Sequence, residues 1–102
     1  MKDIDLNGFE QMAASGAIVL DFYTTLCSPC KQMAPIIEEV EAKRPDIAFF
    51  KVNAQESPDL AARFSIRTVP TFLVLNSGMV KGQKGGTMSS AQMQTWIDDC
   101  LR

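Results

Sequence analysis

Short apolar runs along the chain predict the strands of one sheet. Ile18–Tyr23 is nearly continuously apolar, as expected for a central strand covered on both faces. Ile47–Val52 predicts a second buried strand and Thr71–Leu75 a third. Asn76–Gly78 is a turn signal, so the strand that begins at Met79 should return antiparallel.

Helical spacing appears before and between these runs. Asn7 and Glu10 fit a capping box that opens a first short helix. A second helix is expected to begin around Pro29, and Pro35 should kink it. Four apolar residues of this helix recur at i, i+3, i+4 and i+7 and form one face: Met33, Ile36, Ile37 and Val40.

Two further cap signals complete the order of elements. Ser57–Pro58 fits the N-cap and first position of a short third helix, and Ser89 with Gln92 caps a last helix. The order is then βαβαβαββα. It predicts the α/β class, with a central mixed sheet of about five strands flanked on both faces by about four helices.

Length and composition restrict the function classes. The 102 residues predict a single domain spanning 1–102. A net charge of −2 gives no electrostatic footprint for nucleic acid or an anionic membrane. The chain contains no apolar run of roughly 20 residues, and its N-terminus lacks the apolar core of a signal peptide. We expect a cytoplasmic monomer without nucleic-acid or membrane partners.

The cysteines carry the strongest chemical signal. Cys27 and Cys30 follow a predicted buried strand, and Pro29 suits the first helical position, which would place Cys27 at a helix N-terminus. Free backbone N–H groups and the helix dipole stabilise a thiolate there. Cys30, one turn further on, can close onto the Cys27 sulfur. The spacing therefore fits a dithiol that cycles with a disulfide.

Other uses of the pair are a zinc site or a static disulfide. Zinc requires about four ligands, whereas the chain has three cysteines and no histidine. Lack of histidine also removes Ser-His-Asp and Cys-His nucleophile systems. The third cysteine, Cys100, falls on the apolar stripe of the last predicted helix, where a buried, inert thiol is expected. We expect a redox pair and no bound metal.

Asp21 is the second unusual residue, because it interrupts an apolar strand between Leu20 and Phe22. Burying a charged carboxylate is costly, so its pKa should rise unless the group is paired. An acid with a raised pKa could take the proton of Cys30 directly or through a water. The alternative is an aspartate at a strand edge that faces solvent.

Three motifs in this order and separation resemble the thioredoxin family over essentially the whole chain. They are the strand Ile18–Tyr23 with its acid, the Cys27–Lys31 segment (Cys-Ser-Pro-Cys-Lys), and Thr68–Thr71 (Thr-Val-Pro-Thr). The resemblance implies a thioredoxin fold and a thiol–disulfide oxidoreductase that reduces protein disulfides. It implies no bound cofactor beyond the redox-active Cys27–Cys30 disulfide.

The resemblance also implies residue roles. Cys27 would be the attacking thiolate and Cys30 the less exposed, resolving thiol. Asp21 would accept a proton, and Lys51 would lie near this buried acid. The alternative for Lys51 is an ordinary lysine whose stem lies on apolar surface while its ammonium reaches water.

On the substrate side, the family's equivalent of Pro70 is cis and lies against the cysteine pair, so the Val69 backbone would pair with an extended substrate segment. Gly86 matches a glycine that leaves the substrate groove open, although a glycine there also fits a plain loop. The residues expected to contact substrate are Leu26, Ser28, Pro29, Val69, Pro70 and Gly86.

Three positions depart from the family pattern. Leu26 and Ser28 stand where a tryptophan and a glycine are usual, and Tyr23 stands where tryptophan or phenylalanine is more common. These changes bear on the reduction potential and on recognition by the NADPH-dependent thioredoxin reductase expected to recharge the protein, which could be a non-standard one. Two alternatives remain: a dedicated electron donor to one partner enzyme, and a non-catalytic interaction module.

Overall fold

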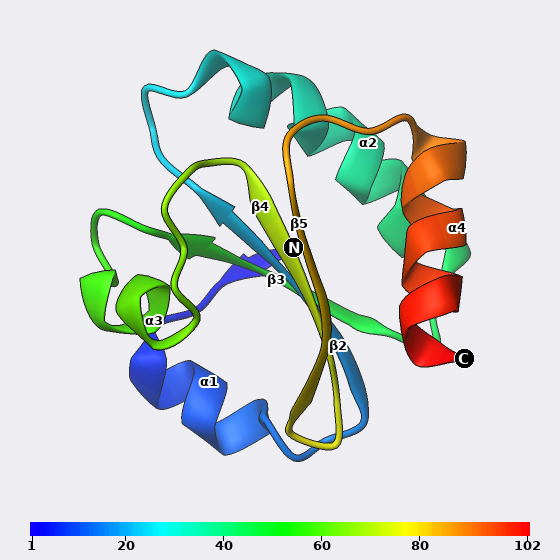
Figure 1. Cartoon of the computed structure of the whole chain (residues 1–102), viewed down its shortest axis with the longest axis horizontal. Coiled ribbons are helices and arrows are strands. Elements are labelled where there is room, and N and C mark those ends of the chain that lie inside the picture. Colours follow the sequence, from blue (N-terminus) through cyan, green and yellow to red (C-terminus); the bar gives the residue numbers. More distant parts are fainter.

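The computed structural model describes residues 1–102 and contains nine elements in the predicted order (Figure 1). They are β1 (Lys2–Asp3), α1 (Leu6–Met12), β2 (Ala17–Tyr23), α2 (Ser28–Lys43), β3 (Ala48–Asn53), α3 (Pro58–Arg63), β4 (Thr71–Asn76), β5 (Met79–Gly85) and α4 (Ser90–Leu101). No helix combines the length and the apolar character that crossing a bilayer requires.

The five strands form one mixed sheet in the order β1-β3-β2-β4-β5. The strands β1, β3 and β2 run parallel, whereas β4 pairs antiparallel with β2 and β5 pairs antiparallel with β4. The predicted α/β class, the mixed sheet and the closing hairpin are therefore confirmed. The central strand is β2, as its apolar run indicated.

Helices cover both faces of the sheet, α1 and α3 on one and α2 and α4 on the other (Figure 1). Successive side chains of a strand point to opposite faces. Along β2, therefore, Ile18, Leu20 and Phe22 pack with Phe9 of α1 and Leu60 of α3. On the opposite face Val19 joins a cluster with residues of α2 and α4, among them Met33, Ile37, Met93 and Ile97. Asp21 lies two residues after Val19, on the same face of β2, and borders a pocket with residues of α2.

The predicted starts of α2 and α4 agree with the structure to within one residue. At α4 the Ser89 side chain accepts from Gln92 N and the Gln92 side chain accepts from Ser89 N, so the predicted capping box is present. At α2 the N-cap is Cys27. Pro29 takes the second helical position and not the first, because the helix already begins at Ser28.

The predicted cap of α1 was wrong, whereas Ser57 and Pro58 occupy the predicted N-cap and first position of α3. The cap of α1 is Asp5, whose side chain accepts from Gly8 N at 2.9 Å, and Asn7 lies inside the first turn. Ser57 does occupy the N-cap position of α3, but its side chain makes no capping hydrogen bond. The two-residue strand β1 had no predicted range, because it is too short to show an alternating pattern.

Candidate active site: the Cys27–Cys30 pair and its surroundings

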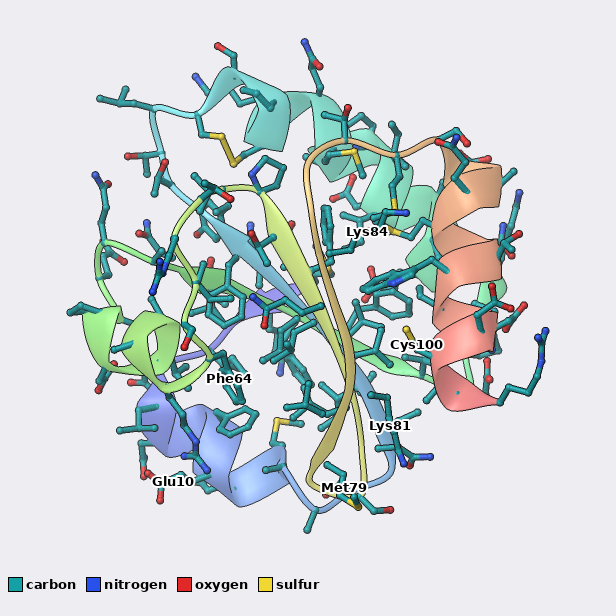
Figure 2. All side chains as sticks on the ribbon, in the orientation of Figure 1. Glu10, Phe64, Met79, Lys81, Lys84 and Cys100 are labelled. Atoms are coloured by element: carbon teal, nitrogen blue, oxygen red, sulfur yellow. A yellow bond between two sulfur atoms is a disulfide. The ribbon has the colours of Figure 1, made fainter.

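The two cysteines lie at the junction between β2 and α2. After β2 ends at Tyr23, a short turn leads to Cys27 as the N-cap of α2, and Cys30 follows in the first helical turn. Their Cα atoms are 5.2 Å apart and a disulfide joins their sulfurs (Figure 2). The predicted disulfide-capable pair is therefore present.

The start of α2 provides the polarity that a thiolate needs. Cys27 Sγ accepts a hydrogen bond from Cys30 N at 3.2 Å. The first N–H groups of a helix lack intrahelical partners and carry the positive end of its dipole. After reduction, the same donor and dipole would favour the charged form of Cys27. Cys27 and Cys30 are 8% and 7% exposed, so burial does not distinguish them and only the N-cap position does.

Several residues predicted on the substrate side lie beside the pair. The Val69–Pro70 peptide bond is cis, and Cys27 Sγ lies 3.7 Å from the Val69 carbonyl oxygen. Gly86 N donates to the Pro70 carbonyl at 3.0 Å. Gly86 has a φ of +93°, and a Cβ placed there would meet nothing within 4 Å, so the space in front of it is open.

The exposed rim of this region comes from the turn before α2 and the first residues of the helix. Leu26 is 91% exposed, which is the largest value among the exposed apolar side chains. Ser28 and Pro29 are also exposed. An exposed apolar side chain therefore directly precedes Cys27.

Asp21 is buried, 6% exposed, and its Oδ1 has no hydrogen-bond partner. Burial raises the pKa of this carboxyl to about 6, while the nearby Lys51 charge opposes the rise and the Asp3 charge adds to it. The prediction of a buried acid with a raised pKa is confirmed, and the alternative of a solvent-facing aspartate is wrong.

Asp21 and Cys30 share a pocket of about 200 Å³. Its other lining residues include Tyr23 and Lys51 from the sheet and Lys31 from α2. A liquid water occupies about 30 Å³, so the pocket is large enough to admit water. Asp21 and Cys30 therefore border the same space, which water can enter.

Lys51 lies on β3 in register with Asp21 of β2. Its only ion pair, however, is with Asp3, whose Oδ2 lies 3.8 Å from the Lys51 ammonium. Asp3 also accepts a hydrogen bond from the Tyr23 hydroxyl at 2.6 Å. Sequence reasoning did not identify Asp3 as a site residue. A lone aspartate in a two-residue strand gives no signal, since only the pairing of β1 with β3 places it here.

Cys100 lies apart from this site, on α4, packed at the margin of the apolar cluster between α4 and the sheet. It is partly buried, not fully buried as expected, and burial raises the pKa of its thiol. The structure contains no group of three or more histidine, cysteine or acidic side chains arranged to hold a metal ion.

A mixed sheet covered on both faces, with a Cys-x-x-Cys disulfide at the start of the helix that follows its central strand, defines a dithiol–disulfide exchange protein. Comparison with known proteins identifies the family. The family model described as Thioredoxin matches residues 3–99, so the chain belongs to the thioredoxin family.

Individual proteins similar to this chain are thioredoxins as well. The chain is 35% identical over 97 residues to a thioredoxin of Buchnera aphidicola, covering 93% of this chain and 90% of that protein. It is 29% identical over 85 residues to Thioredoxin C-3 of Corynebacterium nephridii, covering 83% of this chain but only 59% of that protein. The oxidised form of mitochondrial thioredoxin 3 from Saccharomyces cerevisiae superimposes with a TM-score of 0.89 at 30% identity, covering 97% of this chain and 94% of that one.

These similarities and the cysteine pair establish the fold and the general activity. The chain has the thioredoxin fold, and it is a thioredoxin-type disulfide oxidoreductase.

Proposed function

We propose that this protein reduces disulfides of partner proteins through Cys27 as nucleophile and Cys30 as resolving thiol. One observation carries the assignment of roles. Cys27 is the N-cap of α2, with its sulfur hydrogen-bonded to a first-turn N–H and facing the Val69 carbonyl. Cys30 lies within the helix and shares a pocket with Asp21.

The proposed reaction has two exchange steps. The Cys27 thiolate attacks one sulfur of a substrate disulfide, forms a mixed disulfide and releases the other substrate sulfur as a thiolate. Cys30 then attacks the Cys27 sulfur, releases the second substrate thiolate and closes the Cys27–Cys30 disulfide. Two electrons pass from the protein to the substrate, and the Val69 backbone holds the substrate segment as an added strand.

Asp21 would act in the second step. The thiol of Cys30 must lose a proton as it attacks, and a carboxylate with a pKa of about 6 is a base that is ionised at neutral pH and near enough in strength to accept it. The shared pocket supports this transfer. Lys51 would contribute its charge to the same site.

We further propose that an NADPH-dependent thioredoxin reductase recharges the protein. Leu26 and Ser28 replace the usual tryptophan and glycine next to the cysteines, so the proposed partner is a reductase adapted to this surface. No bound cofactor is proposed. Residues 1–102 are proposed to act as one monomeric domain in the cytoplasm, a reducing compartment in which a dithiol form persists.

The exposed Leu26 favours a second candidate, a dedicated electron donor to one partner enzyme. The redox chemistry would be the same as that of a general reductant, but a single partner protein would recognise Leu26 and the exposed residues beside it. A third candidate, a non-catalytic interaction module, would not need either cysteine.

The deciding experiment is substrate trapping with Cys30→Ser. Because this variant can attack but cannot resolve, it should accumulate mixed disulfides through Cys27 in cells that depend on the wild-type protein, and mass spectrometry would identify the partners. Many trapped partners support a general reductant, and one dominant partner supports a dedicated donor.

The matched control is Cys27→Ser in the same cells. It should trap nothing and should not sustain function. If Cys27→Ser sustained normal function, the oxidoreductase proposal would fail and the interaction module would replace it. If Cys30→Ser trapped no partner while the wild type was active, the assignment of nucleophile and resolving thiol would be wrong.

A further inference from the structure

Three charged side chains lie in register across adjacent strands of the sheet. Asp3 of β1 is paired with Lys51 of β3, and Lys51 is paired with Asp21 of β2. Residues paired directly across neighbouring strands point to the same face. Lys51 therefore lies between two aspartates in the sheet, Asp3 at the edge and Asp21 in the interior.

Asp3 is held on two sides. Its Oδ1 accepts the hydrogen bond from the Tyr23 hydroxyl at 2.6 Å, and its Oδ2 lies 3.8 Å from the Lys51 ammonium. That ammonium also lies 5.6 Å from the centre of the Tyr23 ring. Tyr23, Asp3 and Lys51 thus form a closed group in which each contacts the other two. Tyr23 lies two residues after Asp21 on β2, so it shares the face of Asp21.

Lys51 forms its ion pair with Asp3, the aspartate at the sheet edge, and not with Asp21. Asp21 Oδ1 has no hydrogen-bond partner, and Asp21 has no ion pair. Neighbouring strands are about 4.8 Å apart, so the backbone positions of the two aspartates are roughly 10 Å apart. A lysine drawn toward Asp3 stabilises the charged form of Asp21 less than one that points at Asp21 would.

We infer that Asp3, oriented by the Tyr23 hydroxyl, is a positioning residue that holds the Lys51 ammonium away from Asp21 and so keeps Asp21 able to take the Cys30 proton. This inference rests on the proposed role of Asp21 in the resolving step. Asp3 itself touches neither substrate nor the cysteines.

The electrostatic directions agree with the geometry. Burial is the main cause that raises the pKa of Asp21 to about 6, and Lys51 lowers it while Asp3 raises it further. Burial, followed by the hydrogen bond to Asp3, raises the pKa of the Tyr23 hydroxyl to about 12, so this donor stays protonated at all working pH values. The other titratable groups around the pocket are Lys31 and Glu38 of α2 and the α-amino group of Met1, which is paired with Glu41 at 3.5 Å. Cys30 also borders the pocket but is held in the disulfide in the oxidised protein. None of these residues changes in the variants below.

The test is a titration of the Asp21 carboxyl carbon by NMR in the oxidised protein. Asp3→Asn removes the competing charge and frees Lys51, so the midpoint of Asp21 should fall by about half a pH unit. Asp3→Glu, which keeps the charge, should restore much of the wild-type midpoint. The control is Asp5→Asn, which removes one exposed negative charge from the same end of the chain and keeps a good N-cap for α1.

Tyr23→Phe tests the orienting hydroxyl. Without it Asp3 is freer to turn to solvent, so the Asp21 midpoint should fall in the same direction by a smaller amount. In the double variant, Asp3→Asn with Tyr23→Phe, the total shift of the Asp21 midpoint should be smaller than the sum of the two single shifts, since both substitutions act through the position of Lys51.

The resolving step is read in parallel by stopped flow, with a chromogenic aromatic disulfide whose second thiol is released when Cys30 attacks. In Asp3→Asn the pH profile of the rate of this phase should shift to lower pH by the same amount as the Asp21 midpoint.

Two results would overturn the positioning role: an unchanged Asp21 midpoint in folded Asp3→Asn, or an equal fall in Asp5→Asn. If the midpoint falls in both Asp3→Asn and Tyr23→Phe while the kinetic profile stays in place, the positioning of Lys51 is upheld and the proposed proton transfer to Asp21 fails.

Discussion

Asp21 is in an environment that carboxylates rarely occupy, and this has a consequence for stability that is separate from catalysis. Its pKa is about 6 in the folded protein and 3.8 is its ordinary value. Between these two pH values the folded state binds more protons than the unfolded state. Stability must therefore fall as pH rises through this window, and the full loss remains above pH 6.

A shift of about two pKa units corresponds to about 3 kcal/mol. Asp21→Asn removes the charge but keeps the shape, so we expect unfolding free energies equal to wild type near pH 4 and higher by up to about 3 kcal/mol near pH 7. Urea unfolding of the oxidised proteins between pH 4 and 8 measures this difference.

Glu10→Gln is the control for this comparison, because Glu10 is an exposed carboxylate on α1 without an ion pair. Its difference from wild type should stay within about 0.5 kcal/mol at every pH. A pH-independent difference for Asp21→Asn would mean that Asp21 does not titrate in this window.

At the scale of elements, the two helices on the active-site face begin with side-chain caps of different purpose. Cys27 caps α2 with a reactive sulfur, and Ser89 caps α4 in a reciprocal capping box with Gln92. The cap of α4 has no part in the proposed chemistry. It fixes the start of the helix that supplies Met93 and Ile97 to the core behind the active site.

Ser89→Ala should lower the unfolding free energy by about 1 kcal/mol, since one orphan N–H of α4 loses its acceptor. The neighbouring Ser90→Ala is a matched control. Ser90 Oγ is buried without a hydrogen-bond partner, so its removal should be neutral or stabilising. Denaturant midpoints of the two variants measure the contrast, and equal losses would contradict the assignment of the cap.

At the scale of the whole molecule, α4 closes against the edge strand β5. Gly82 of β5 faces Cys100 and Trp96 of α4, and a Cβ added at Gly82 would overlap Cys100 Sγ. Figure 2 shows Cys100 on the side of α4 that faces the sheet. The absence of a side chain at Gly82 is what permits this close approach.

Gly82→Ala should therefore lower the unfolding free energy by about 1–2 kcal/mol, because Cys100 must leave its rotamer or α4 must move away. Adding Cys100→Ala removes the overlapping sulfur, so the same glycine substitution should have a clearly smaller effect in that background. Thermal unfolding of the four proteins measures this coupling. An effect of equal size in both backgrounds would place the strain elsewhere.

Much of this architecture could be predicted from local patterns. The apolar runs located β2, β3 and β4, the Asn-Ser-Gly turn gave the closing hairpin, and Ser89 with Gln92 gave the start of α4. These signals are readable because each depends on residues within a few positions of one another. The errors have the same origin. At α1 two neighbouring polar residues could cap the helix, and only the fold selected Asp5 over Asn7.

For the site, the sequence alone determined the residues that carry charge or sulfur in unusual surroundings: the cysteine pair after a strand, and an acid inside an apolar one. Burial of Asp21 follows from the nearly continuous apolar run of β2, which indicates a strand covered on both faces and is a local property. The tertiary structure decided which groups Asp21 and Lys51 meet. The pairing of β1 with β3 brings Asp3, 48 positions away in sequence, beside Lys51, and packing of the turn before β4 brings Val69 to Cys27. Such contacts depend on strand register and chain crossings, which no short stretch of sequence specifies.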